Sequence, residues 1–246
     1  AAPDVSSQPS ASGREATKRI LLDAIAYFQE VRERDGSTPV DFGVKGGELD
    51  KKSRAPRNLA ADRAFYRISE DLGAAADKVL DAVKELELYN PNPRPLQAFG
   101  EESGAQRCLL HGVWKLMFTT AADATFSKDT RRGDADVSNE VDAVAGAVTN
   151  CIAFKAMEGE QPPVLEELRV RLSATAESDS RLALTFRYVK ARVTKFFGIP
   201  LGGRRLTLTL PVPGPFLTRI LSFFTRKPPP RPYFDILYLD DELRIH

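Results

Sequence analysis

The sequence predicts an α+β protein in which amphipathic helices precede an antiparallel β meander or barrel. Apolar residues recur at the helical period in the first part of the chain and alternate with polar residues after His111. No helical pattern separates the alternating runs, which disfavours parallel βαβ units. We therefore expect a disordered leader over 1–13, a helical element over 14–90 and a β domain over 91–246.

Three amphipathic helices are expected in the helical element. The first runs from Arg14 to Arg34, with its apolar residues on one stripe, and Asp35-Gly36 ends it. The second begins near a cap at Asn58 and continues through Leu72, and the third spans 74–88. The prolines of NPNPRP then end the third helix.

Five runs alternate with period two and are rich in β-branched or aromatic residues: GVWKLMFTT, LRVRLSAT, RLALTFRYV, RRLTLTL and YFDILYL. Alternation places Leu182, Leu184, Phe186 and Tyr188 on one strand face. If the sheet closes into a barrel, such faces either line an apolar cavity or fill a solid core. The candidate lining residues are Trp114, Leu116, Phe118, Phe186 and Tyr188.

Composition excludes several classes of protein. Hydrophobic residues at 42% and charged residues at 28% are typical of soluble globular domains rather than of disordered chains or membrane-spanning bundles. Two cysteines and two histidines are too few for a disulfide scaffold or a His-rich metal site. The opening AAPDVSSQPSASG, which starts with Ala1, is interpreted as following a removed targeting peptide, with a trimmed chain as the alternative.

Charge is unevenly distributed along the chain. Residues 181–234 contain eleven basic residues and no acidic one, although the whole chain has a net charge of only +1. This segment either meets an anionic surface or presents solvated outer strand faces. Nucleic acid is disfavoured, because the basic residues lie on both strand faces and no nucleic-acid-binding motif accompanies them.

No catalytic constellation is present in the sequence, so an enzyme is not expected. The glycines at Gly43, Gly46 and Gly47 lack the strand-to-helix context of a phosphate loop, and Cys108 near His111 lacks an orienting third group. The acidic run from Asp240 to Glu242 suits either a hard cation or a tight turn, and its place between two short strands favours the turn. No metal is expected.

A phenylalanine-rich segment, PVPGPFLTRILSFFTRKPPPRP, separates two of the predicted strands. Apolar residues with a basic rim are typical of segments that lie in a membrane interface, and a short helix capping the end of the barrel is the alternative. The candidate residues for membrane or partner contact are Phe216, Leu217, Arg219, Ile220, Phe223, Phe224, Arg226 and Lys227.

Four stretches resemble the plastid lipid-associated protein family, the fibrillins. They are ELELYNPNPRP, GVWKLMFTTAADATF, NEVDAVAGAVTNCIAF and YFDILYLDDELRIH, and the last resembles the C-terminal hallmark of the family most specifically. The structural motif residues there are Asp235, Tyr238, Asp240, Asp241 and Arg244. We expect Arg244 to meet a carboxylate on a neighbouring strand, either Asp235 or Asp142.

The resemblance implies a lipocalin-like barrel in a plastid protein associated with thylakoids, plastoglobules or the stroma. It implies a non-enzymatic protein with no required cofactor that binds or organises lipid, carotenoid, chlorophyll or quinone. The expected partner is a membrane lipid surface. The alternative is a structural subunit attached to a photosystem or antenna complex.

Overall fold

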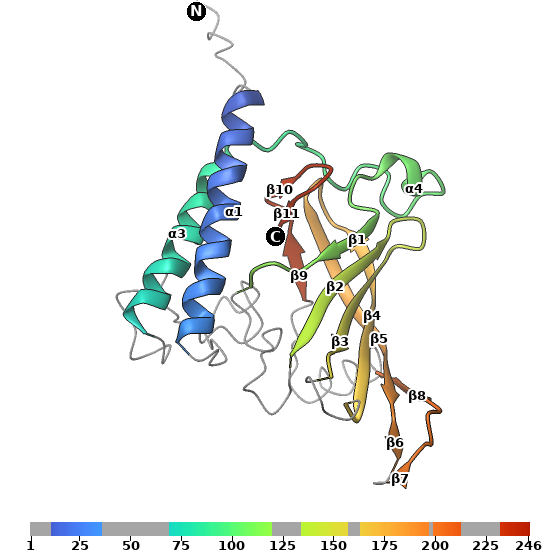
Figure 1. Ribbon diagram of the computed structural model, residues 1–246. Helices are drawn as coiled ribbons and strands as arrows, with labels where there is room; N and C mark the ends of the chain where they lie inside the picture. The colour runs from blue at the N-terminus through green and yellow to red at the C-terminus, as the bar shows by residue number, and fades with distance from the viewer. Residues whose placement is uncertain (1–10, 36–68, 120–133, 157–162, 197–198, 213–231) are drawn as a thin grey trace, which may run out of the picture.

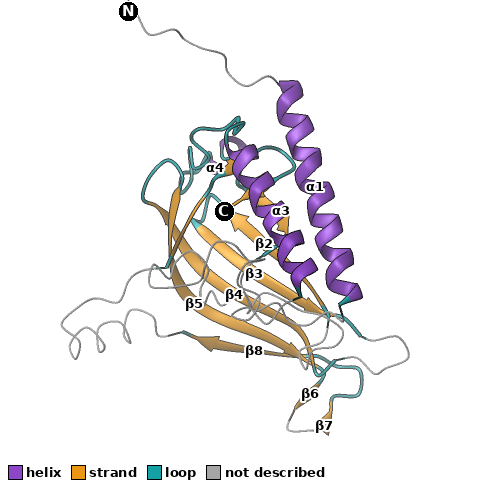
Figure 2. Cartoon of the chain, turned by 90° about the vertical axis from the view of Figure 1, so that its left-hand side faces the viewer, coloured by secondary structure: helices purple, strands orange, loops and turns teal. Residues whose placement is uncertain are grey.

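The computed structural model describes residues 11–35, 69–119, 134–156, 163–196, 199–212 and 232–246. Within them, two long helices lie on one side of a seven-stranded sheet, as Figures 1 and 2 show from two directions. The predicted α+β class is therefore confirmed. Apart from Pro211, Val212 and Pro232 at its ends, the phenylalanine-rich segment falls within 213–231 and lies outside the described residues, as do residues 1–10 of the predicted leader.

The long helices are α1 (Ala11–Arg34) and α3 (Glu70–Glu87), which pack side by side. Extended Ser69 caps α3, and its Oγ accepts a hydrogen bond from the Leu72 backbone N at 3.0 Å. The third predicted helix therefore starts earlier than expected. The prediction that the second helix runs through Leu72 is wrong, because the chain is extended at Ser69. A short helix, α4 (Gly104–Arg107), precedes the sheet.

The main sheet is an antiparallel meander, because its strands pair largely in chain order. Along this path it contains β1 (Gly112–Lys115), β2 (Ala135–Asp142), β3 (Ala147–Phe154), β4 (Leu165–Ala176), β5 (Arg181–Val193) and β8 (Leu206–Pro211). A further strand, β9 (Tyr233–Asp235), pairs with the beginning of β5. Two small hairpins complete the described strands: β6 (Lys195–Phe196) with β7 (Ile199–Pro200), and β10 (Tyr238–Leu239) with β11 (Arg244–Ile245).

The expected closed barrel is not found. Strand β1 forms one edge of the main sheet, and no pairing between described residues joins it to β8 or β9 on the other side. The sheet is open in the described part of the chain. Its neighbouring strands nevertheless run antiparallel, as the sequence predicts. The prediction was therefore wrong about closure of the sheet but right about strand direction.

The two faces of the sheet differ in chemistry. We call inner the face that carries Trp114, Asn139, Asn150, Val170 and Val189, which are successive register partners from β1 to β5. The opposite, outer face carries charged and hydroxyl side chains. Phe118, which follows β1, has its ring centroid 5.0 Å from that of Phe28 in α1, so the inner side is the side of the helices.

A β-bulge in β5 overturns one predicted face. Arg171 pairs with Tyr188 and the next residue, Leu172, pairs with Phe186, so Arg187 is extra on β5. Because one inserted residue exchanges the faces of a strand, Tyr188 lies on the outer face and does not share the face of Leu184.

Two apolar cores are joined by the C-terminal hairpin. The first lies between α1 and α3 and includes fully buried Tyr238. The second lies at the end of the sheet near α4 and includes fully buried Leu239. Adjacent residues of β10 therefore enter different cores, and the hairpin couples the helices to the sheet.

Candidate ligand-binding face and its polar end

An apolar surface covers the part of the inner face that neither core includes. We call it the open inner face. Two cross-strand rows form it, and their side chains are half-buried rather than buried. Its residues are Val137, Ile152, Leu168, Val170, Val189, Ala191 and Leu208. Alternation puts apolar side chains here because every second residue of each strand points to this side.

Such a surface is suited to an apolar ligand. The side chains project from paired strands, so the backbone groups beneath them are already hydrogen-bonded and offer no competing polar contact. Burying apolar surface is favourable by about 25 cal/mol per Å². A sizeable apolar patch on a protein surface is typical of a site that binds a ligand, a partner or a membrane.

Arg244 marks the polar end of the open inner face. Its Nη2 donates a hydrogen bond to Asn139 Oδ1, and its Cζ lies 5.6 Å from the centroid of the Trp114 ring. Asn139 Nδ2 in turn donates to Asn150 Oδ1 at 2.8 Å. We call these four residues the Arg244 cluster. Trp114 is held in place by a 2.9 Å hydrogen bond from its Nε1 to the Leu110 carbonyl.

The Arg244 cluster contains no carboxylate. Asp235 accepts two hydrogen bonds of 2.6 Å from Arg181, and Asp142 lies 4.0 Å from Arg171. The expected ion pair of Arg244 with either aspartate is therefore wrong, because β9 places Asp235 directly opposite Arg181. Burial lowers the pKa of Arg244 to about 10.

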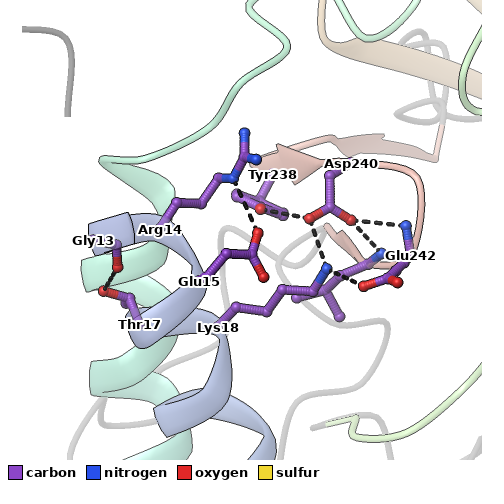
Figure 3. A network of polar contacts seen from close by, with 9 residues as sticks. Gly13, Arg14, Glu15, Thr17, Lys18, Tyr238, Asp240 and Glu242 are labelled. Atoms are coloured by element: carbon purple, nitrogen blue, oxygen red, sulfur yellow. Dashed lines mark hydrogen bonds and ion pairs between the residues drawn. The ribbon is translucent and has the colours of Figure 1, made fainter. Parts of the chain in front are cut away.

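The aspartates of the C-terminal motif shape the turn between β10 and β11. Asp240 Oδ1 accepts hydrogen bonds from the backbone N of Glu242 at 2.8 Å and of Leu243 at 2.6 Å. Its Oδ2 accepts from Tyr238 Oη at 2.7 Å and from Lys18 Nζ at 2.9 Å (Figure 3). These contacts confirm the turn interpretation of the acidic run.

Lys18 links this turn to the first helix, α1. Its side chain is only 8% exposed, and Nζ lies 2.7 Å from Glu242 as well as bonding Asp240 (Figure 3). Burial opposes the charge of Lys18, but the hydrogen bonds from it to the two carboxylates raise its pKa overall. Asp240 and Glu242 therefore connect the last turn of the chain to α1.

A polar pocket of about 350 Å³ lies on the outer face and includes Tyr188. Its two acidic side chains are paired: Glu140 with Arg169, and Glu167 with Arg192 at 2.9 Å. The hydrogen bond from Arg169 lowers the pKa of Glu140. This polar, charged surface is chemically unlike the open inner face, so Tyr188 is separated from the other candidate lining residues.

The remaining candidate lining residues are placed as follows. Trp114 belongs to the Arg244 cluster, and the backbone N of Leu116 donates to the Val137 carbonyl at 2.9 Å. Phe118 packs against the helical core. Phe186 is opposite Leu172 and is 43% exposed. Trp114, Leu116 and Phe186 are therefore on the inner side of the sheet, whereas Tyr188 is on the outer face. The candidate membrane contacts, Phe216 to Lys227, lie outside the described residues.

Cys108 and His111 do not form a nucleophile and base. His111 Nδ1 accepts a hydrogen bond from the Ala143 backbone N at 3.1 Å, and Cys108 Sγ contacts the Pro95 carbonyl at 3.7 Å. Burial raises the pKa of the Cys108 thiol. This arrangement suits a structural role for both residues.

Asn139 and Lys18 were not singled out by sequence reasoning. The signal for Asn139 was present, because it interrupts the alternating apolar positions Val137 and Val141, as Asn150 does on the next strand. Lys18 had no comparable signal, since a single lysine on an amphipathic helix is ordinarily on its solvated face.

Comparisons with known proteins agree with the motifs. The PAP_fibrillin family model matches residues 61–246. No curated protein and no solved structure matches the chain. No helix in the described ranges is long and apolar enough to cross a membrane. With the family match extending over most of the chain, including the C-terminal motif around Asp240, this protein belongs to the PAP_fibrillin family of plastid lipid-associated proteins.

Proposed function

We propose that this protein is a non-enzymatic plastid protein that binds an apolar ligand on the open inner face. The observation that supports the proposal most directly is the two-row apolar surface outside both cores. Val170 and Val189 face each other at its centre and are half-buried. The ligand would complete the burial of these side chains, which is favourable because apolar surface leaves water.

The proposed location is the surface of a thylakoid membrane or plastoglobule, after removal of a targeting peptide. The family is plastid-associated, and the basic segment 181–234 is suited to anionic headgroups. The phenylalanine-rich segment would supply the apolar contact, chiefly through Phe216, Leu217, Phe223 and Phe224. Closure of the sheet into a lipocalin-like barrel would enclose the ligand, and it remains part of this proposal.

Trp114 offers a direct binding assay because it is the one tryptophan of the chain and lies beside the open inner face. A decyl-substituted benzoquinone should quench its fluorescence saturably. Val189→Gln places a polar group on this face and should weaken the quenching several-fold. The matched control is Lys190→Gln on the adjacent outer position, which should bind as the unmodified protein does, with near-UV circular dichroism unchanged in both variants.

Extraction of the protein from its native plastid tests the proposal independently. Mass spectrometry of an organic extract should find a stoichiometric lipid, carotenoid, chlorophyll or quinone that a mock purification lacks. An empty extract together with unquenched Trp114 would overturn the ligand proposal. Recovery in a detergent-resistant photosystem or antenna complex would instead favour the structural-subunit alternative.

A further inference from the structure

Arg244, at the edge of the open inner face, has a buried N–H group without a hydrogen-bond acceptor in the described part of the chain. Its Nη1 is buried and has no hydrogen-bond partner in the described part of the chain. Its neighbours, Asn139 and Trp114, are neutral. A buried cation ordinarily has a counter-ion, because removing a charge from water is costly unless the charge is paired.

The geometry points to a specific ligand: we propose that Arg244 binds the carboxylate of a long-chain carboxylic acid whose tail lies along the open inner face. This inference rests on the proposed function and specifies the head group of the ligand. A guanidinium presents its N–H groups in a planar fork that matches a carboxylate. One uncompensated cation also matches one negative charge better than the two charges of a phosphate monoester.

The apolar rows start at the Arg244 cluster, as a tail would require. Asn150 pairs with Val170, and Val170 pairs with Val189, so polar side chains give way to apolar ones along a single cross-strand row. The neighbouring row is apolar throughout, and with strands about 4.8 Å apart it spans roughly 19 Å from Val137 in β2 to Leu208 in β8. This distance accommodates a long alkyl chain laid across the strands.

Three other arginines of the sheet do not offer the same site. Arg169 and Arg192 on the outer face are paired with glutamates, and Arg181 is paired with Asp235. Arg244 differs from them because it combines a buried, unpaired Nη1 with an adjoining apolar surface. The ligand carboxylate would therefore replace the protein carboxylate that the sequence leads one to expect.

The test compares a fatty acid with its uncharged ester on the full chain. Cis-parinaric acid and its methyl ester share a fluorescent tail and differ in the charge of the head. The unmodified protein should bind the acid roughly ten- to a hundredfold more tightly than the ester, the range given by a hydrogen bond to a charged group. Arg244→Met should abolish this preference and leave ester binding unchanged.

Two further variants serve as controls. Arg244→Lys keeps the charge but not the fork, and should restore part of the preference if Arg244→Met has removed it. Arg204→Met removes an exposed positive charge from the turn before β8, and should keep the full preference. Near-UV circular dichroism checks that each variant is folded, and Arg244→Lys replaces Arg244→Met in the comparison if the latter is not.

The outcomes separate the two proposals. Equal binding of acid and ester by the unmodified protein would overturn the role of Arg244 and leave the apolar face intact. A preference that survives in folded Arg244→Met would overturn it as well. If neither probe binds, the open inner face is not a ligand site, and both proposals fail.

Discussion

Lys18, near the start of the first long helix, and Asp240, in the last turn of the chain, form an ion pair in which Nζ lies 2.9 Å from Oδ2. Both side chains are largely buried, at 8% and 13% exposure. The turn that contains Asp240 follows β10, whose residues Tyr238 and Leu239 enter the helical core and the sheet core respectively. The pair therefore fastens α1 to the element that joins the two cores.

Replacing Lys18 by Met should destabilise the protein. The substitution keeps most of the apolar stem but leaves Asp240 without its charged partner, and we expect a loss of about 2 kcal/mol in the free energy of unfolding. Urea denaturation measures this loss of stability. The matched control is Lys84→Met, which removes an exposed pair with Asp81 on α3 and should change stability little. Equal effects of the two variants would contradict the assigned role of Lys18.

The same pair predicts a dependence of stability on pH. Burial alone would raise the pKa of Asp240, but the hydrogen bonds from Lys18 and Tyr238 outweigh it and lower this pKa below its ordinary value of 3.8. A lowered folded-state pKa gives stability that is present above pH 3.8 and is lost as the pH falls through the folded value. Because the folded-state pKa of Lys18 is raised, the stabilisation by the pair persists in alkaline solution and is lost only as the pH rises above 10.5.

Asp240→Asn should therefore reduce the free energy of unfolding most in the middle of the pH range. The difference in unfolding free energy between the unmodified protein and this variant should be constant from roughly pH 5 to pH 9 and shrink as the solution becomes strongly acidic. Denaturation series at several pH values measure it, with Asp81→Asn as the exposed control. A difference that grows toward acid would show that Asp240 is not charged in the folded protein.

The local elements could be predicted from the sequence because their signals are local. The apolar stripe from Leu21 to Val31 gave α1, and alternation gave the antiparallel strands. The hairpin of β2 and β3 was not among the predicted strands, and its stretch was noted only for its resemblance to a family motif, although Val148, Asn150 and Ile152 alternate as a strand should. Its apolar positions are interrupted by asparagines, which weakened the pattern.

Long-range relationships were the ones missed, since they depend on pairing. Alternation in RLALTFRYV continues unbroken to Tyr188, and only the register against β4 shows that Arg187 is an extra residue. Likewise, the partner of Asp235 is decided by the pairing of β9 with β5, which puts Arg181 opposite it. The composition of a strand says nothing about whether the two edges of a sheet meet, so closure could not be derived either.

Gly104 should tolerate no side chain, because it lies where two backbone segments meet. A Cβ there would be 2.9 Å from the Ala98 carbonyl O and 3.0 Å from the carbonyl C and O of Ala143. These atoms belong to the backbone and cannot move aside as a flexible side chain would. Gly100 N also donates to Ala143 O at 2.6 Å, which fixes the segment at this distance.

Gly104→Ala should therefore lower the free energy of unfolding by about 1–3 kcal/mol, the usual cost of overpacking. Glycine to alanine is ordinarily stabilising within a helix, so a loss of stability would identify the close contact with Ala143 as its cause. Gln106→Ala, at an exposed position of the same short helix, is the control and should have little effect. If Gly104→Ala instead increased the stability, α4 would not pack closely against Ala143 in the turn between β2 and β3, and the contact described here would be wrong.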